Sequence, residues 1–236
     1  MRYLPIRVTA HLAHGFAVAQ PWGIALDGLL ASQLWQDMAA EETDVPYPSE
    51  TLNPPDLDLP LGKCQPRDGA PWHWSATCCE PIGQHRTEVR YRHHQLDHSA
   101  VAALTDRDLP AAMPGDQGRY RSRRMPLIVT VCAAVTWSAV GDPVEVRRLL
   151  RPIASIGKKR SHGEGVVTGW DVTIADRDLW EAGHLHRDGT LGRPTPTGCL
   201  PHHLQGTPPA LAGIRPPYMH PSRRTHLHLP APLDAH

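Results

Sequence analysis

The stretch "LIVTVCAAVTWSAVGDPVEVRRLLRPIASIGKKRSHGEGVVTGWDVTI" (residues 127–174) decides the fold. Its first part, 127–137, is a continuous apolar and β-branched run, which predicts a buried strand. Its last part, 166–174, is again rich in β-branched residues and predicts another strand. A helix and a basic, glycine-rich turn fill the space between them. The stretch therefore indicates a succession of strand, helix, turn and strand.

The helix in this stretch starts with a recognisable set of capping residues. Asp142, Pro143 and Glu145 have the spacing of N-cap, N1 and N3 residues. We expect the helix to run to about Ser155 and Gly157 to serve as its C-cap.

The N-terminal part of the chain supplies a matching strand and helix. Apolar and polar residues mostly alternate over 4–12, which is typical of a half-buried strand. Residues 26–42 predict a helix with Asp27 as its N-cap. The apolar face of this helix comprises Leu26, Leu29, Leu30, Leu34 and Met38. A weaker alternation over 86–94 predicts a further strand.

Taken in order, these elements form a βαββαβ pattern, which predicts an α+β fold of the ferredoxin-like (RRM-like) type. We expect one domain over 1–175 with a large insertion at about 43–118. Ten of the 25 prolines fall between Pro194 and Pro232, and proline lacks the amide hydrogen that helices and sheets require. Residues 176–236 are therefore predicted to be a proline-rich extension packed on the domain or on partners.

The overall composition excludes several classes of protein. The 236 residues carry 24 Lys and Arg against 24 Asp and Glu, so any nucleic-acid site must come from local clusters of basic residues. Five cysteines without regular spacing form no disulfide framework. The N-terminus is typical of a strand rather than a signal peptide, and no apolar run reaches the roughly 18–20 residues of a membrane span. We expect a cytoplasmic protein that makes no membrane contact.

The basic turn is the first candidate site. A P-loop or a dinucleotide-binding loop needs a strand before its glycines and a helix after them. Here a helix precedes the glycines and a strand follows, which excludes both. Glycine lets the backbone approach a ligand closely, and the adjacent cations Lys158, Lys159 and Arg160 suit phosphate. A capped helix followed by a solvated turn is the alternative interpretation.

A second basic segment, "GRYRSRRMP", occupies residues 118–126. In a βαββαβ sheet the middle strands neighbour the outer ones, so both basic segments could border one face. Tyr120 and Trp170 are candidates for stacking on a base, with a surface anchor and a core residue as the respective alternatives. The chain lacks the aromatic pattern of a sequence-reading RRM. The two segments therefore favour a ligand that carries several phosphates.

Three motifs carry a resemblance to a known family. "LDGLLA" at 26–31, "GRYRSRRMPL" at 118–127 and "IGKKRSHGEGVV" at 156–167, together with the N-terminal strand, resemble the RAMP proteins of CRISPR systems. The chain is most similar to the Cas-five-type subunit of type IV effector complexes. The likeness covers about 1–175, and the proline-rich segments 193–196 and 215–224 also look like the end of that subunit.

The resemblance implies a RAMP domain over 1–175 in a non-catalytic, RNA-binding subunit. Such a subunit holds the five-prime handle of the CRISPR RNA and caps a filament of backbone RAMP subunits, and the complex pairs its guide with target DNA. The resemblance also leaves room for a helicase recruited to the complex. The RNA-binding residues that it implies are Gly157, Lys158, Lys159, Arg160, Ser161, His162, Gly163, Gly165, Arg119, Tyr120, Arg121, Arg123 and Arg124. One departure is Glu164, where the family often has an aromatic residue.

Other chemistry finds less support in the sequence. The densest mixed cluster of possible metal ligands comprises Cys64, His73, Cys78, Cys79 and His85. It holds no C-x-x-C pair, so we expect no metal and no cofactor. A metal-independent CRISPR RNA endonuclease of the same fold is the alternative function, with His14 or His162 as its base. A scaffold that binds only protein is a third interpretation.

Overall fold

The structure is a computed structural model that describes residues 3–41, 51–94, 123–206 and 208–233. The chain divides into two compact units, one made of Met1–Arg86 and Thr130–His236 and the other of Thr87–Val129.

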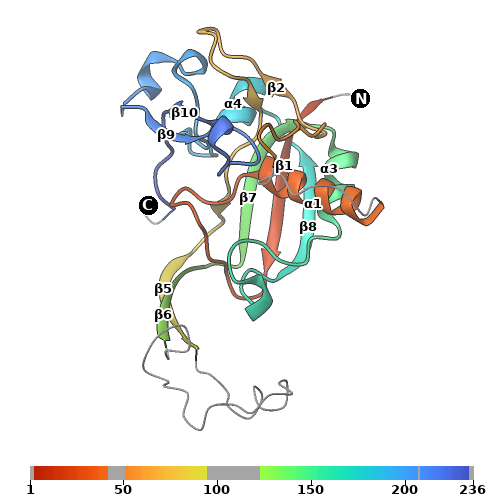
Figure 1. The fold of residues 1–236 in the computed structure, drawn as a ribbon, viewed down its shortest axis with the longest axis vertical. Helices are drawn as coiled ribbons and strands as arrows, with labels where there is room; N and C mark the ends of the chain where they lie inside the picture. The colour runs from red at the N-terminus through yellow and green to blue at the C-terminus, as the bar shows by residue number, and fades with distance from the viewer. Residues whose placement is uncertain (1–2, 42–50, 95–122, 207, 234–236) are drawn as a thin grey trace. The chain divides into compact units, whose positions relative to one another are not determined.

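The larger unit is organised around a four-stranded antiparallel sheet with the strand order β4-β7-β1-β8 (Figure 1). β1 pairs with β7 on one side and with β8 on the other, so that Val8 lies opposite both Trp137 and Val172. The predicted strand over 4–12 is confirmed. The bounds of the four strands are β1 Leu4–Leu12, β4 Glu80–Pro81, β7 Ala134–Gly141 and β8 Val167–Ile174.

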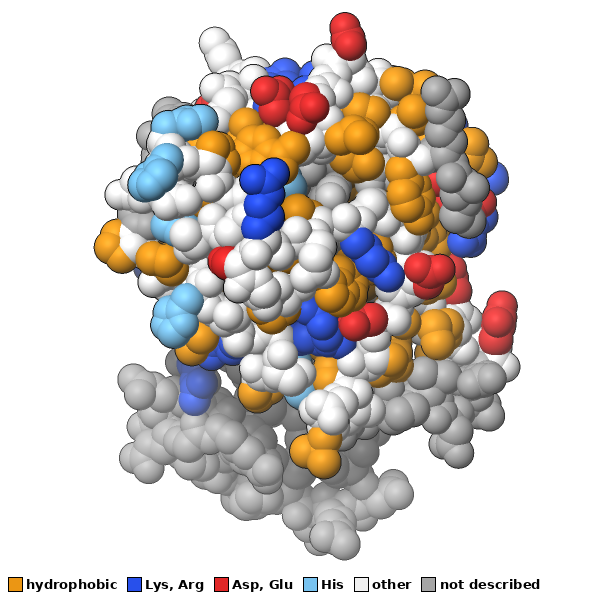
Figure 2. Space-filling model, turned by 90° about the horizontal axis from the view of Figure 1, so that it is seen from above, with side chains coloured by type: hydrophobic (Ala, Val, Ile, Leu, Met, Phe, Trp, Pro, Cys, Tyr) orange, Lys and Arg blue, Asp and Glu red, His pale blue; other side chains and the backbone are white. Residues whose placement is uncertain are grey.

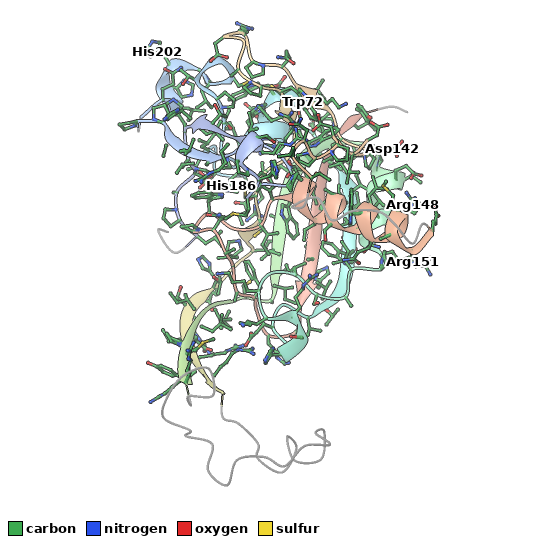
Figure 3. The ribbon with its side chains drawn as sticks, in the orientation of Figure 1. Trp72, Asp142, Arg148, Arg151, His186 and His202 are labelled. Atoms are coloured by element: carbon green, nitrogen blue, oxygen red, sulfur yellow. The ribbon has the colours of Figure 1, made fainter. Side chains whose placement is uncertain are left out.

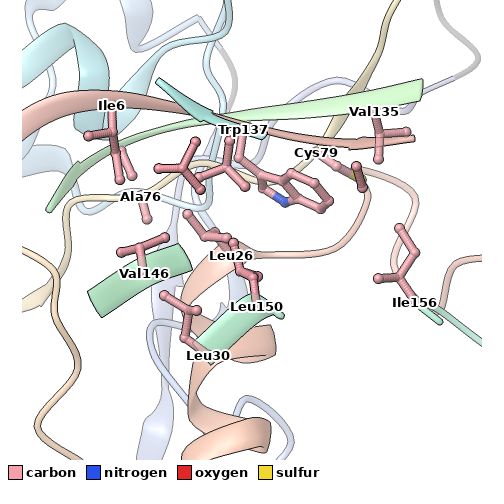
Figure 4. Close-up of a cluster of buried hydrophobic side chains, with 14 of the residues drawn as sticks. Ile6, Leu26, Leu30, Ala76, Cys79, Val135, Trp137, Val146, Leu150 and Ile156 are labelled. Carbon is pink, nitrogen blue, oxygen red and sulfur yellow. The ribbon is translucent and has the colours of Figure 1, made fainter. Parts of the chain in front are cut away.

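Two helices, α1 (Leu26–Glu41) and α3 (Pro143–Leu150), pack against each other and bury apolar side chains on one face of this sheet. Figure 4 shows Leu26 and Leu30 of α1 and Val146 of α3 around Trp137 of β7. Trp137 is fully buried, and its indole Nε1 donates a hydrogen bond of 2.7 Å to the Ile24 carbonyl. The buried ring therefore leaves no polar atom unpaired. Among the described residues, no helix has the length and apolar character needed to cross a membrane.

The larger unit is thus a mixed α/β structure with an antiparallel sheet. Its main elements follow the order β1, α1, β4, β7, α3 and β8. This succession and the strand order are compatible with a ferredoxin-like fold.

The prediction for the second strand of this pattern is wrong. Residues 86–94 do form a strand, β5 (Arg86–His94), but it pairs with β6 (Arg123–Val131) in a separate two-stranded sheet. The edge position of the main sheet belongs to β4, and a bridge between Ala76 and Ala139 extends this edge. Residues 72–78 do alternate apolar and polar side chains, but they lie inside the predicted insertion, and β4 itself is only two residues long.

The apolar run over 127–137 holds parts of two strands instead of one. β6 ends at Val131 and β7 begins at Ala134. Val129 and Val135 are both fully buried on either side of the break. Because the residues on both sides of the break are apolar and buried, the apolar pattern does not show where β6 ends and β7 begins.

The start of α3 is confirmed and its predicted end is wrong. An oxygen of Asp142 accepts hydrogen bonds from the backbone amides of Val144 and Glu145 at 2.9 and 3.3 Å, as an N-cap should. The helix ends at Leu150 rather than at Ser155, and its C-cap is Arg151 rather than Gly157. Pro152 explains the early end, because proline has no amide hydrogen with which to continue the helical hydrogen bonds.

Asp27 lies within the first turn of α1 and is fully buried, so its predicted N-cap role is wrong. The Tyr218 hydroxyl donates a hydrogen bond of 2.5 Å to its carboxylate, and the Gly28 amide donates another of 3.0 Å. The guanidinium of Arg193 lies 3.8 Å from the other carboxylate oxygen. Burial raises the pKa of Asp27 even beside this cation.

Arg193 itself is buried in the extension, with only 1% of its surface exposed. Its guanidinium donates hydrogen bonds to the backbone carbonyls of Trp74, Ala76 and Ile214, and more weakly to that of the adjacent Pro194. The side chain therefore joins α1, the edge of the sheet and the C-terminal extension.

The rest of the extension contains only short elements, in keeping with its prolines. These are α4 (Leu179–His184), β9 (Ala210–Gly213) and β10 (Arg224–Leu227), the last two paired in a small sheet. Arg215 and Arg223 both form ion pairs of 2.9 Å with Asp56, which fasten this part to an earlier segment. Two more short strands, β2 (Lys63–Cys64) and β3 (His73–Trp74), form a hairpin.

Replacing Arg193 should destabilise the fold far more than replacing an exposed arginine. Arg193→Met leaves the buried Asp27 without its cation and removes the hydrogen bonds of the guanidinium, which should lower the free energy of unfolding by about 3–5 kcal/mol. The control Arg187→Met removes a partly exposed pair with Glu80 of 3.4 Å and should cost less than about 1 kcal/mol. Urea denaturation of the full chain measures both, and equal losses would contradict the role assigned to Arg193.

Candidate nucleic-acid interface

The basic loop, defined here as residues 157–165, connects α3 to β8 at the lower end of the sheet in Figure 1. Its two ends are fixed to the segment that follows β1. The Lys158 amide donates to the Ala17 carbonyl at 2.7 Å, and the Gly165 amide donates to the Gly15 carbonyl at 3.1 Å. The loop is thus held at both ends by backbone hydrogen bonds to the same neighbouring segment.

Two of its glycines are required by this close packing. Gly157 has φ +80° and Gly165 has φ +70°, a conformation that side chains disfavour. A Cβ atom at Gly157 would collide with the Ala17 carbonyl, and one at Gly165 would collide with the Ile156 carbonyl. At Gly163, which also has a positive φ, nothing lies within 4 Å. Gly157 and Gly165 therefore anchor the loop, whereas Gly163 lies on its open side.

The cations between these anchors are exposed. Lys158, Lys159 and Arg160 all face solvent, and in the described part of the chain none of them forms an ion pair. Other arginines are paired: for example, Arg148 lies 2.8 Å from Glu145. Figure 3 shows Arg148 with Arg151 at the outer side of the helical layer. Within the described ranges, the loop therefore offers cations that are paired with no acidic side chain.

The backbone of the loop changes handedness twice. Lys159 has φ 61°, the one positive φ of a non-glycine residue in the described ranges. A short 3₁₀ turn, Arg160–His162, follows in the right-handed region, and Gly163 returns to the left-handed region with φ +85°. Within this turn the amides of His162 and Gly163 donate to the carbonyls of Lys159 and Arg160 at 2.9 and 3.0 Å. The Ser161 hydroxyl lies 3.0 Å from Nδ1 of His162 and adds a further polar group.

Glu164 does not counteract these cations at the surface. Only 7% of the residue is exposed, so it contributes little to the outer surface of the loop. The departure from the family pattern at Glu164 thus leaves the outer surface of the loop basic.

Beside the loop, a cleft of about 100 Å³ lies between α1 and residues 152–155, with Arg160 at its edge.

The second basic segment is only partly described. Arg119, Tyr120 and Arg121 lie outside the described residues. Arg123 and Arg124 begin β6 in the smaller unit and are exposed, and the Arg124 guanidinium lies 3.9 Å from the ring centre of Tyr91. That both basic segments border one face stays a prediction.

The sheet face that α1 and α3 leave uncovered is polar. It carries Arg7, Thr9 and His11, and His11 Nε2 lies 2.7 Å from a carboxylate oxygen of Asp171. Trp170 lies on the covered face, where its ring centre is 5.8 Å from that of Trp137. The core interpretation of Trp170 is therefore confirmed. Thr136 and Ser138 of β7 are buried on this face, which is therefore only partly open, and among the described strands it provides no aromatic platform for bases.

The end of the molecule away from the loop has a different charge pattern. On the face shown in Figure 2, Lys and Arg side chains stand singly among acidic and apolar ones. That face therefore lacks the concentration of cations found in the basic loop.

Sequence reasoning missed a cluster of four possible metal ligands. The side-chain donor atoms of Cys64, His73, His184 and Cys199 all lie within 4.8 Å of one another. Burial lowers the pKa of His73 to about 4, which keeps its imidazole neutral. The cluster that stands out in the sequence ends at His85. It includes Cys64 and His73, but the other two ligands of this set, His184 and Cys199, come from beyond residue 180. The four share no short spacing, and only the folded chain brings them together.

Comparison with known proteins agrees with the sequence motifs. No curated protein matches the chain. The family model described as CRISPR type IV associated protein Csf3 matches residues 4–230. This match runs from the first strand through the basic loop to the end of β10. The chain therefore belongs to the Csf3 family of CRISPR type IV associated proteins.

Proposed function

We propose that this chain is a non-catalytic, RNA-binding subunit of a type IV CRISPR ribonucleoprotein in the cytoplasm. Its domain is a RAMP domain of the ferredoxin-like type, and its basic loop holds the five-prime handle of the CRISPR RNA. The chain caps the filament of backbone subunits, and the assembled complex pairs its guide with target DNA. One observation carries the proposal: exposed, unpaired cations on an anchored loop in a member of the Csf3 family.

The anchoring of the loop supports a binding role over a merely solvated turn. Backbone hydrogen bonds at Lys158 and Gly165 fix both ends before any ligand arrives. A preformed loop loses less conformational entropy when it binds than a flexible one. Phosphates of a single strand are bound by cations, and the loop supplies three exposed ones. Arg123 and Arg124 of β6 provide further cations for the same strand.

A metal-independent ribonuclease is the second candidate function, because two histidines lie near the loop. His162 is part of it, and His14 directly precedes Gly15, whose carbonyl accepts the Gly165 amide. A nuclease of this kind needs a base for the 2′-hydroxyl and donors for the developing phosphorane. His14 and His162 could each serve as the base.

Removing the three loop cations together should weaken RNA binding. In Lys158→Ala/Lys159→Ala/Arg160→Ala, affinity for the repeat-derived RNA should fall about tenfold or more, because one charged hydrogen bond contributes about 1.5–3 kcal/mol. The slope of log K against log salt should become shallower by about 2, because each phosphate that the protein neutralises on a single strand contributes roughly 0.7 to that slope. Fluorescence anisotropy over a salt series measures both quantities.

The matched control removes three exposed cations elsewhere, at Arg67, Arg148 and Arg187, and changes the net charge equally. It should leave the affinity and the salt slope nearly unchanged. If the loop variant kept wild-type RNA binding, or if both variants lost it equally, a protein-only scaffold would replace the proposal.

A cleavage assay separates the two candidate functions. Incubation of the full chain with repeat RNA and no added divalent metal should leave the RNA intact, because the proposal assigns binding and no catalysis to the loop. Products are resolved on denaturing gels. A cut at one position that disappears in His14→Ala or His162→Ala would establish the nuclease instead.

A further inference from the structure

Four elements bring two cysteines and two histidines together at the end of the sheet opposite the basic loop (Figure 1). Cys64 of β2 and His73 of β3 are direct partners in the hairpin, so their side chains share one face. His184 is the last residue of α4, and Cys199 ends a 3₁₀ turn in the extension. The Sγ atoms of Cys64 and Cys199 are 3.4 Å apart. Two zinc–sulfur bonds of 2.3 Å at the tetrahedral angle would place them about 3.8 Å apart.

The histidines are oriented as metal ligands usually are. His73 donates from Nδ1 to the Trp74 carbonyl at 3.1 Å, and His184 donates from Nδ1 to the Trp180 carbonyl at 2.6 Å. A carbonyl can only accept, so each Nδ1 carries the proton and each Nε2 presents a lone pair. This is the outer hydrogen-bonding arrangement that fixes a metal-binding tautomer.

Both Nε2 atoms are buried and have no hydrogen-bond partner. A buried polar atom without a partner costs free energy, and two of them at one point call for a common explanation. The indole of Trp180 stacks on His184 with ring centres 4.9 Å apart, which holds the imidazole in place. A cation between the four donors would satisfy both nitrogens at once.

We propose that Cys64, His73, His184 and Cys199 bind one structural Zn²⁺ ion. Two thiolates and two neutral imidazoles are a donor set that zinc prefers, and four protein ligands leave no open position for catalysis. Two thiolates also balance the charge of the ion, which suits a site close to the buried Arg193. A groove lined by Arg67, Trp180 and both cysteines gives the ion a path from solvent.

The ion would join parts of the chain that have few other means of holding together. β2 and β3 are two residues long, and α4 has six residues. The apolar cluster of the extension consists of Ala212, Ile214 and Leu227, with Leu229 beside it. Zinc would therefore fasten the β2–β3 hairpin to α4 and to the start of the proline-rich segment.

Metal analysis of the full chain tests the site directly. The protein is purified with zinc in the growth medium and without a histidine tag, and its metals are measured by mass spectrometry. We expect about one zinc per chain in the wild type. Cys64→Ser, Cys199→Ser and His73→Asn should each lose most of it. The matched controls Cys132→Ser and His203→Asn change residues outside the cluster and should keep it.

Cobalt gives a readout that does not depend on whether a variant folds. Wild-type protein stripped of zinc and given Co²⁺ should show the visible bands of tetrahedral cobalt and a thiolate-to-cobalt charge-transfer band. Folded wild-type protein with reduced thiols that carries no zinc and shows no cobalt bands would overturn the proposal. So would iron with inorganic sulfide at the site. A Cys64–Cys199 disulfide in the purified protein, with no metal uptake after reduction, would also overturn it.

Discussion

The buried guanidinium of Arg193 is the contact on which the arrangement of the larger unit depends. A buried cation must be neutralised and fully hydrogen-bonded, and backbone carbonyls together with the carboxylate of Asp27 do this. Those groups come from α1, from the edge of the sheet and from the extension. The same Trp74 carbonyl also accepts a hydrogen bond from Nδ1 of His73. The Arg193 network and the proposed zinc site therefore share an atom, and together they hold the extension on the domain.

The two ends of the sheet have separate physical roles. At one end, buried charges and the cysteine–histidine cluster hold together segments that are too short and too rich in proline to form stable structure on their own. At the other end, backbone hydrogen bonds fix the basic loop, whose cations form no ion pair with any residue that the structure describes. The chain belongs to the Csf3 family of CRISPR type IV associated proteins, and the RNA-binding role of this second end is our proposal. In our account the first end provides stability and the second provides RNA binding.

Local patterns predict some of these features and miss others for physical reasons. The alternation over 4–12 and the Asp142 cap are sufficient for β1 and for the start of α3, because both signals are local. The edge strand β4 gives a weaker signal, because it is only two residues long and lies in a segment whose prolines and glycines resemble a loop in sequence. Asp27 resembles a cap because an acid at a helix start has that role in most proteins, whereas its partners Arg193 and Tyr218 are more than 160 residues away. The loop residues are visible in the sequence since they are contiguous, but the cysteine–histidine cluster is assembled from distant segments.

The central claim is that the basic loop contacts the CRISPR RNA, and ultraviolet cross-linking of the assembled ribonucleoprotein tests it most directly. The chain is digested after irradiation, and peptides that carry a nucleotide are identified by mass spectrometry. The account predicts adducts on the peptide that contains residues 158–163, joined to nucleotides of the five-prime handle. Recovery of that peptide unmodified, with adducts of the chain confined to other segments, would contradict it.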